Sequence, residues 1–487
     1  MNKILSRLLC VPALVFALSS FSFSQSADDA LRLSTPGLGV GARSTGLAGA
    51  FTGVASDYSA IFSNPAGLAQ MSHNEFSLGL ESFSYNNSST FLGNPGSASN
   101  SSTDLNTLGM VYQIPTERGS LVLALGFNRQ SDFTTALVFN AFNPSSSIIP
   151  NLAQTDPNLA YQLYLTGQNG YTPFRDSLQQ RGNVLEGGGV NNWSAAIAAE
   201  AARNLYVGVT VTFISGSYSY ARDYNEIDTL DKYNVANYDT NFALSSLNLS
   251  QSINSELSGF TATLGMLYKF GNKSRFGLSV KLPTWYSVRE NYDTFGTSVF
   301  DVPDTAGNYS YTYDSPFSQR YDVTSPFVFS AGASTDIADL MIAASADYTD
   351  WTQMSFSSQD FDVSQLNANI KNTFQSTLNL HIGAEYDVAS ITDFGLRLRG
   401  GYAYLPSPYK GDPSSFSQKY ITGGIGLIFE DAIGLNFSYV HGTWDTYHVN
   451  YSVISAQPNI YNPVPPDPKT LESITQNTIM GTLTYRF

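Results

Sequence analysis

Four stretches of the chain alternate between apolar side chains and small or polar ones. In "GFTATLGMLYKF", residues 259–270, every even position is apolar and most odd positions are Gly, Thr or Lys. The same pattern occurs in residues 393–405, 432–440 and 478–487. A period of two places successive side chains on opposite faces of a β-strand. These stretches therefore predict strands with one apolar face and one face of small or polar residues.

Composition distinguishes between the two all-β folds that such strands can form, a soluble sandwich and a membrane barrel. Charged residues make up 13% of the chain and aromatic residues another 13%, whereas about 25% of the residues in soluble domains are charged. The polar faces consist mainly of Gly, Ser, Thr and Asn, and aromatic residues gather near the ends of the segments. This pattern is typical of a transmembrane barrel with an apolar face toward lipid, a polar interior and aromatic girdles at both interfaces.

We count about fourteen alternating segments, an even number, as a single-chain bacterial outer-membrane barrel requires. They lie near residues 75–85, 105–114, 120–130, 192–200, 204–222, 258–270, 274–290, 320–333, 339–357, 374–387, 393–405, 419–429, 433–450 and 476–487. The predicted fold is thus an all-β, antiparallel transmembrane β-barrel.

The connections between these segments alternate in length. Short ones such as "AARN" and "GNK" are followed by long stretches rich in Asn, Asp, Ser and Tyr. The long stretches lie near 86–104, 131–191, 223–257, 291–319, 358–373, 406–418 and 451–475. Because outer-membrane barrels have short periplasmic turns, we expect the long stretches to be extracellular loops. Within the longest, the Leu and Ala spacing of residues 151–170 predicts a short helix.

Residues 1–24 are predicted to be a secretory signal peptide. Lys3 and Arg7 precede the short apolar run "LLCVPALVFAL", and "SFS" at 22–24 offers small residues for cleavage. Cys10 is the one cysteine of the chain, and it lacks the preceding small residue of a lipid-anchor site, so we expect an exported protein without thiols. After the signal no run of about eighteen apolar residues occurs. With a net charge of −15 and no basic patch, we expect no nucleic-acid partner.

The segment "LGVGARSTGLAGAFTGVASDYSAIFSNPAGLAQ", residues 38–70, resembles the N-terminal part of the FadL-type outer-membrane transport proteins. "ADYTDWTQMSF" at 346–356, "RLRGGYAYLPSPY" at 397–409 and "YITGGIGLIFEDAIGLNFSYV" at 420–440 extend the resemblance. That family includes transporters of long-chain fatty acids and channels for aromatic hydrocarbons. The resemblance implies a fourteen-stranded barrel plugged by an N-terminal hatch. It also implies passive uptake of hydrophobic compounds, which are captured at the outer loops, pass a pocket above the hatch and leave through the wall at a kinked third strand.

On this basis residues 25–74 are predicted to form the hatch and residues 75–487 the barrel. A hatch must approach the wall closely, and glycines permit tight packing and unusual backbone angles. The candidate hatch and gating residues are Gly41, Arg43, Gly46, Gly49, Phe51, Asn64, Pro65, Ala66 and Gly67. Asn64-Pro65 would fix a turn that places "AGLA" against the wall. The alternative is a periplasmic tail or a lead-in to the first strand.

The third strand supplies the candidates for a lateral gate. By resemblance, "SLVLALGFNRQSDF" at 120–133 would be the kinked strand, in which Gly126, Asn128 and Arg129 interrupt the apolar run. Glycines are also common in barrel strands without any special role, so this prediction rests on the resemblance.

Four cations on inward faces are candidates for ligand binding in the lumen: Arg397, Arg399, Lys281 and Arg275. A buried cation could hold a fatty-acid carboxylate by charge-assisted hydrogen bonds, and Arg397 or Arg399 would be the first choice. The alternative is that acidic residues neutralise these cations across the lumen.

The sequence contains no motif for metal binding or catalysis. The four His residues lack metal-ligand spacing, and neither G-x-S-x-G nor a phosphate-binding loop occurs. We therefore expect no cofactor, no metal and no enzymatic activity, and a monomer surrounded by outer-membrane lipids. Phe487, the terminal residue, matches the signal that the barrel assembly machinery commonly recognises. Two alternatives stay open: a barrel that shuttles or secretes surface proteins without small-molecule cargo, and a membrane-embedded enzyme.

Overall fold

The computed structural model describes residues 26–167, 169–234, 243–391, 394–454 and 465–487. The predicted signal peptide, with Cys10, lies outside the described residues.

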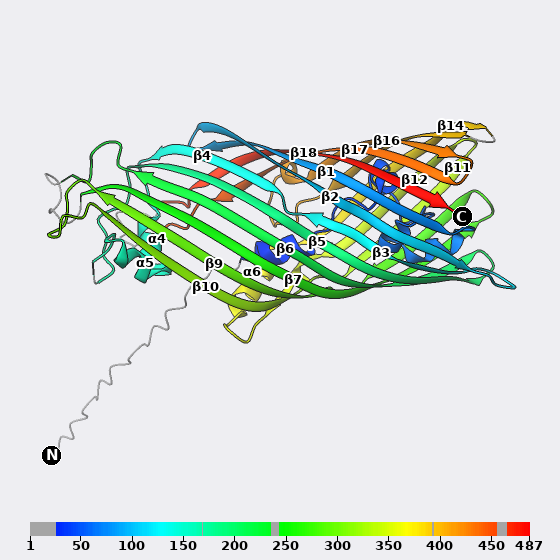
Figure 1. Ribbon diagram of the computed structural model, residues 1–487, viewed down its shortest axis with the longest axis horizontal. Coiled ribbons are helices and arrows are strands. Elements are labelled where there is room, and N and C mark those ends of the chain that lie inside the picture. Colours follow the sequence, from blue (N-terminus) through cyan, green and yellow to red (C-terminus); the bar gives the residue numbers. More distant parts are fainter. Residues whose placement is uncertain (1–25, 168, 235–242, 392–393, 455–464) are drawn as a thin grey trace, which may run out of the picture.

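The chain forms one closed antiparallel barrel of fourteen strands (Figure 1), as predicted. The first and last strands pair along their length, from Glu75↔Arg486 to Phe91↔Thr470. The strand segments are β1 (Glu75–Phe91), β2 (Asn94–Ile114), β3 (Leu121–Asp132), β4 (Thr135–Asn143), β5 (Leu178–Ala202), β6 (Leu205–Ile227), β7 (Leu244–Phe270), β8 (Ser274–Lys281), β9 (Trp285–Phe300), β10 (Ser310–Thr324), β11 (Val328–Ile337), β12 (Leu340–Asp350), β13 (Ser355–Ser357), β14 (Ser376–Ile391), β15 (Phe394–Leu405), β16 (Gln418–Phe429), β17 (Ile433–Val449) and β18 (Lys469–Arg486).

Four barrel strands are interrupted, which is why eighteen segments make the sheet. The interruptions separate β3 from β4, β8 from β9, β10 from β11, and β12 from β13. Pro283 and Pro326 lie in the second and third of these breaks, where a residue without an N–H cannot donate to the ladder. In the fourth, Asp350 caps a short 3₁₀ turn, η3 (Trp351–Gln353).

Several strands extend much farther outward than the alternation predicted. Most of 86–104, predicted as a loop, is strand, because β1 and β2 are joined by residues 92–93 alone. Parts of 223–257 and 291–319 likewise belong to long strands. The outer part of β2, from Asn94 to Asp104, consists of Asn, Asp, Ser, Thr, Gly, Pro and Ala, so it lacks the apolar alternation that marks the inner half.

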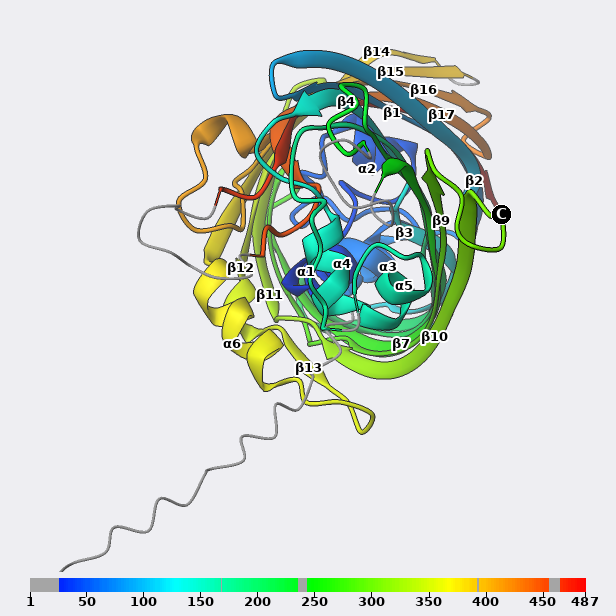
Figure 2. The same cartoon turned by 90° about the vertical axis from the view of Figure 1, so that its left-hand side faces the viewer.

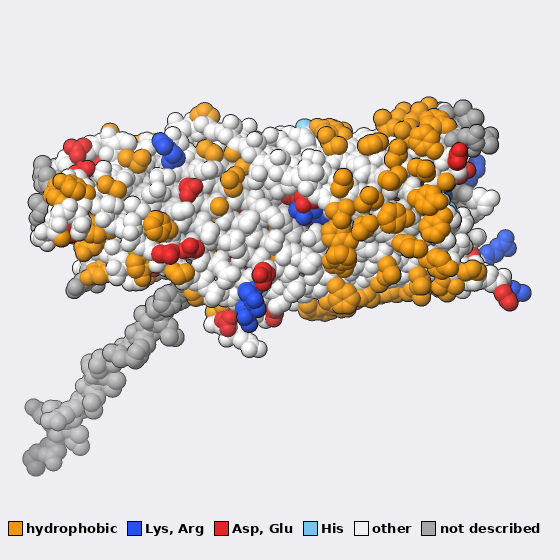
Figure 3. Space-filling model, in the orientation of Figure 1, with side chains coloured by type: hydrophobic (Ala, Val, Ile, Leu, Met, Phe, Trp, Pro, Cys, Tyr) orange, Lys and Arg blue, Asp and Glu red, His pale blue; other side chains and the backbone are white. Residues whose placement is uncertain are grey.

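Exposed apolar side chains form a belt around one half of the barrel. In Figure 3 they gather over the right-hand half, toward the C-terminus and the short turns. On β7 the exposed apolar side chains run from Phe260 to Phe270, which matches the roughly 9–11 residues that a tilted strand needs to cross a bilayer. Phe260 packs with Phe213 and stacks on Trp285 at the outer edge of the belt, as an aromatic girdle does.

The hatch lies inside this barrel, below the helices of the outer end (Figure 2). It contains α1 (Ala27–Ser34), α2 (Ala42–Gly46), α3 (Ala60–Ser63) and η1 (Pro65–Gln70). Farther out, the predicted helical loop forms α4 (Ile149–Thr155) and α5 (Pro157–Gln162), whereas α6 (Ser364–Thr373) and η4 (Ser414–Phe416) lie in the connections after β13 and β15. Among the described residues no helix is both long and apolar enough to cross a membrane.

Candidate functional site

Hydroxyl groups of the barrel wall hold the backbone of the hatch. Four of them donate to hatch carbonyls at 2.8–3.0 Å: Thr210 to Ile61, Ser279 to Ser63, Ser334 to Gly53, and Thr422 to Gly46. The Ser and Thr residues on the inward faces of the strands therefore satisfy carbonyls that would otherwise be buried without a partner.

The "NPAGLA" turn joins the hatch to the wall through Asn64. Its Oδ1 accepts from the N–H of Ala66 at 3.2 Å and so caps η1, while Pro65 occupies the first position of that helix. Its Nδ2 donates to the carbonyls of Thr52 at 2.9 Å and Met266 at 3.1 Å, the second of which belongs to the wall. Gly67 has no room for a side chain, because a Cβ there would lie 2.0 Å from the Ala55 carbonyl oxygen.

The other predicted hatch residues are also packed inside the lumen. Phe51 is fully buried in the core shared by hatch and wall. Gly41 and Gly49 have φ angles of +76° and +77°, where L side chains are strained. At Gly46 a Cβ would make ordinary contacts, 3.5 Å from the Arg399 side chain. Their role in gating stays a prediction.

Glycines of the wall make room for the hatch. A Cβ on Gly277 would lie 2.1 Å from the Thr52 carbonyl oxygen, and one on Gly265 would lie 2.2 Å from Asn64 Oδ1. A Cβ on Gly208 would likewise lie 2.5 Å from the backbone carbonyl carbon of Pro65. The small residues on the inward strand faces are thus required by the hatch, which the alternation alone did not indicate.

Three of the four predicted lumen cations are paired with acids. Arg399 Nε donates to Glu385 Oε2 at 2.6 Å, and Glu385 also binds Arg43 of the hatch. Arg397 pairs with Asp387 at 2.6 Å, and Arg275 pairs with Asp336 at 3.3 Å. For these three residues the geometry is that of the alternative stated above, neutralisation by acids.

Lys281 is different, because in the described part of the chain it forms no ion pair. Its Nζ donates to Gln130 Oε1 at 3.2 Å, and Asn192 Nδ2 donates to the same oxygen. Gln130 Nε2 and Asn192 Oδ1 are buried without a hydrogen-bond partner among the described atoms. A cation beside unsatisfied amide groups can accommodate a polar or anionic group of a ligand.

His381 links hatch and wall, a role that its sequence context did not reveal. Its Nδ1 lies 2.8 Å from the Ala48 carbonyl oxygen of the hatch, and its Nε2 lies 3.1 Å from Asp347 Oδ2 of β12. Asp347 is 34 residues away in sequence, so only the pairing of β12 with β14 brings the two together.

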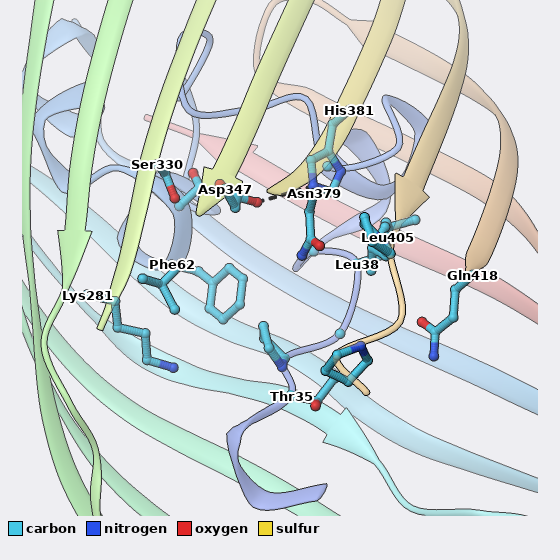
Figure 4. A pocket seen from close by; sticks show the side chains of 18 of the residues that line it. Thr35, Leu38, Phe62, Lys281, Ser330, Asp347, Asn379, His381, Leu405 and Gln418 are labelled. Carbon is cyan, nitrogen blue, oxygen red and sulfur yellow. Dashed lines mark ion pairs between the residues drawn. The ribbon is translucent and has the colours of Figure 1, made fainter. Parts of the chain in front are cut away.

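A pocket of ≈ 260 Å³ lies directly above the hatch (Figure 4). Leu38 and Phe62 of the hatch contribute apolar surface, and Lys281, Asn379 and His381 contribute polar groups from the wall. The hydroxyl-bearing residues of the barrel strands that line it are Ser194, Thr212, Thr261, Thr263, Ser279, Ser330 and Thr446. Its outer side reaches the loop after β15, where Tyr409 Oη donates to Asp28 Oδ1 at 2.8 Å.

The third barrel strand is interrupted at Phe133 and Thr134, between β3 and β4. Backbone pairing between β2 and β3 ends at Thr107↔Asn128, and no described residue of β2 from 94 to 106 pairs with β3 or β4. We call this unpaired stretch of wall the seam. Across it, Asn100 of β2 donates to the Thr135 carbonyl of β4, and Asn87 and Ser89 of the next strand, β1, donate to the β4 carbonyls of Ala136 and Val138.

The predicted gate residues lie at the lower end of the seam. Asn128 is the last paired residue, and Arg129 forms ion pairs with Asp104 and Asp132 at 3.4 and 2.8 Å. Gly126 lies below the seam in regular pairing, where a Cβ would be 2.2 Å from Tyr58 Oη of the hatch. Its close contact is with the hatch, and gating by these residues stays a prediction.

Among the described residues no group of three or more His, Cys, Asp or Glu side chains could hold a metal ion.

No protein-family model and no curated protein matches the sequence. Solved structures do match. A FadL homologue of Pseudomonas aeruginosa has 13% sequence identity and a TM-score of 0.56, over 93% of this chain and 100% of that one. The P. putida toluene transporter TodX has 14% identity and a TM-score of 0.54, over 92% of this chain and 99% of that one. Such likeness at low identity shows the fold, and it agrees with the resemblance read from the hatch sequence.

Proposed function

Because the chain has the FadL-type fold of an outer-membrane barrel, we propose that it is a channel for passive diffusion of hydrophobic compounds across the outer membrane. The observation that carries the proposal is the pocket above a hatch that fills the lumen. Such a pocket gives a ligand a binding site inside the barrel, where the hatch otherwise fills the lumen. No nucleotide or proton coupling is required, because the ligand moves down its own gradient.

The size and lining of the pocket indicate the class of ligand. A cavity of about 150 Å³ accommodates benzene, so the ≈ 260 Å³ here suits a substituted aromatic ring or part of an alkyl chain. Contact with Phe62 and Leu38 would stabilise the apolar part by about 25 cal/mol per Å² of buried surface. Lys281 would favour a ligand that also carries a carboxylate.

Release would occur sideways through the seam. Its edges are held by side-chain hydrogen bonds in place of a backbone ladder, and each such bond contributes only about 0.5–1.5 kcal/mol. The lower end of the seam lies beside Phe127, which packs on Trp193 at a ring distance of 5.1 Å in the apolar belt. A ligand leaving there would reach the hydrocarbon of the membrane.

Uptake by intact cells tests this function. Cells with and without the gene are offered radiolabelled toluene and radiolabelled oleate, and we expect faster uptake of at least one of them when the protein is present. Lys281→Met should reduce uptake of oleate and leave toluene unaffected, and Lys273→Met, at an exposed position of the turn between β7 and β8, is the control. Equal uptake with and without the gene would overturn the proposal. If, in addition, the cells without the gene lack surface proteins that the other cells carry, the shuttle alternative would be favoured.

A further inference from the structure

The rim of the barrel is low on one side. At their outer ends β14, β15 and β16 stop at Ser376, Leu405 and Gln418, whereas neighbouring β17 continues to Val449. The pairing of β16 with β17 ends at Lys419↔Thr443, so the last residues of β17 pair with β18 alone. In Figure 1, β14 and β16 are correspondingly confined to the right-hand part of the barrel.

The pocket above the hatch reaches this low rim. Among its lining residues are Leu405, Tyr409, Phe416 and Trp444, all of them partly exposed. We call this opening of the pocket the mouth. Beside it lies α1 of the hatch, whose Leu31 also lines the pocket and whose Asp28 accepts a hydrogen bond from Tyr409. The mouth is therefore framed by apolar and aromatic side chains on a fixed support.

The low rim lies at the outer edge of the apolar belt. Tyr402 and Ile421, which pair with each other three residues below it, are both exposed on the outside. Tyr439 on β17 is exposed at a similar height. On β14 the exposed apolar row continues through Leu380 to Leu378, two residues below the outer end of that strand at Ser376. The rim of β14–β16 therefore lies just outside the apolar belt, at the level of the outer polar interface of the membrane.

The outer end of the barrel, by contrast, is filled along its axis. α4 and α5 lie across the opening when the molecule is viewed from that end (Figure 2). Fully buried side chains of these helices, such as Ile149 and Leu159, form an apolar core with Leu163, Phe174 and side chains of the surrounding strands. We call these two helices and this core the cap.

From these four observations we propose that small apolar molecules, such as alkylbenzenes, enter the pocket sideways over the low rim of β14–β16, from the outer polar interface of the membrane. This portal rests on the proposed function and changes its first step, since capture would occur at the side of the barrel and not at the axial outer loops. Trp444, Tyr409 and Phe416 would contact the ligand first, and the hatch residues Leu38 and Phe62 next.

Site-specific blocking tests the portal. The only cysteine lies in the predicted signal peptide, so single cysteines can be introduced at Thr446, which lines the mouth, and at Gln154, an exposed position of the cap. Both variants are labelled in intact cells with a bulky, membrane-impermeant maleimide before radiolabelled toluene is added. We expect labelled Thr446→Cys to lose uptake to the level of cells without the gene and labelled Gln154→Cys to retain it. Loss in Gln154→Cys with retention in Thr446→Cys would overturn the portal.

A binding measurement keeps this test separate from that of the proposed function. The purified protein in vesicles is irradiated with a diazirine-bearing alkylbenzene, and the labelled residues are identified by mass spectrometry. Labelling of 405–418 and 444–446 would support the portal. If cells nevertheless show no uptake, the proposed transport function is rejected and the portal is kept as a binding site. Labelling confined to the cap or to the belt would reject the portal.

Discussion

Arg43 of the hatch and Glu385 of β14 are joined by two hydrogen bonds, from Nε to Oε2 at 3.0 Å and from Nη2 to Oε1 at 2.9 Å. The two side chains are 16% and 7% exposed. Arg399 donates to the same carboxylate, and Asp57 accepts from Arg43. Two guanidinium groups and two carboxylates thus balance one another where the hatch meets the wall.

Replacing Glu385 by Gln leaves the two arginines with a single carboxylate. Breaking a buried pair in this way costs about 3–5 kcal/mol, so we expect a lower unfolding temperature and a hatch that loosens enough to raise ion conductance in planar bilayers. Asp387→Asn is the control, because its pair with Arg397 is 31% and 44% exposed and such pairs contribute about 0–1 kcal/mol. Equal conductance of the two variants would show that the Arg43–Glu385 pair does not hold the hatch.

The turn at Asn64 offers a second test of the hatch. Asn64→Asp preserves the acceptor for Ala66 but removes the two donations to the Thr52 and Met266 carbonyls, at a site with no solvent exposure. A carboxylate oxygen would then face the two carbonyl oxygens without a hydrogen, and a buried polar group left unsatisfied costs about 1–3 kcal/mol. This variant should therefore unfold at a lower temperature than the parent protein. Asn86→Ala, at an exposed position of β1, should unfold at the parent temperature. An unaltered unfolding temperature for Asn64→Asp would mean that the turn does not anchor the hatch.

The alternation in the sequence predicted the barrel, but only where the wall faces lipid. "NPGSASNSSTD", the outer half of β2, has no apolar face, and its strand forms because β1 pairs with it residue by residue. Loop-like composition and strand structure coexist there because both faces of the sheet are polar.

The ion pairs of the lumen also differ in how far the sequence could have predicted them. Glu385 and Arg399 are direct partners in the β14–β15 register, as are Asp387 and Arg397, so a known hairpin register would have revealed both pairs. The approach of Arg43 to Glu385 depends on how the hatch sits in the lumen, which no local pattern encodes. For the same reason the sequence did not distinguish Lys281, the cation without an acid, from the paired arginines.

Close packing between wall and hatch predicts that one wall glycine cannot be replaced. In Gly277→Ala the new Cβ would lie 2.1 Å from the backbone oxygen of Thr52, so hatch or strand must move. Overpacking of this kind typically costs about 1–3 kcal/mol, and we expect less folded protein in the membrane and higher conductance from what folds. Gly423→Ala, whose Cβ would have its nearest neighbour at 4.0 Å, should behave like the parent protein. If the two variants fold and conduct alike, the hatch does not occupy the space in front of Gly277.

The cap depends on one buried carboxylate, Glu226 of β6. It accepts hydrogen bonds from the Ile148 N–H at 2.9 Å, Gln180 Nε2 at 2.7 Å and Tyr224 Oη at 2.8 Å, and from the Ser147 hydroxyl. Glu226→Ala would remove the acceptor of the Ile148 N–H and of the Tyr224 and Ser147 hydroxyls, at about 1–3 kcal/mol for each, whereas Gln180 keeps Ser146 and Tyr451 as acceptors. We expect the segment from Ile149 to Gln162 to become sensitive to protease added to intact cells. Glu256→Ala, at an exposed position of β7, removes the same side chain where water already surrounds it and should leave the cap resistant. Equal resistance of the two variants would show that the apolar core of the cap holds α4 and α5 without the carboxylate.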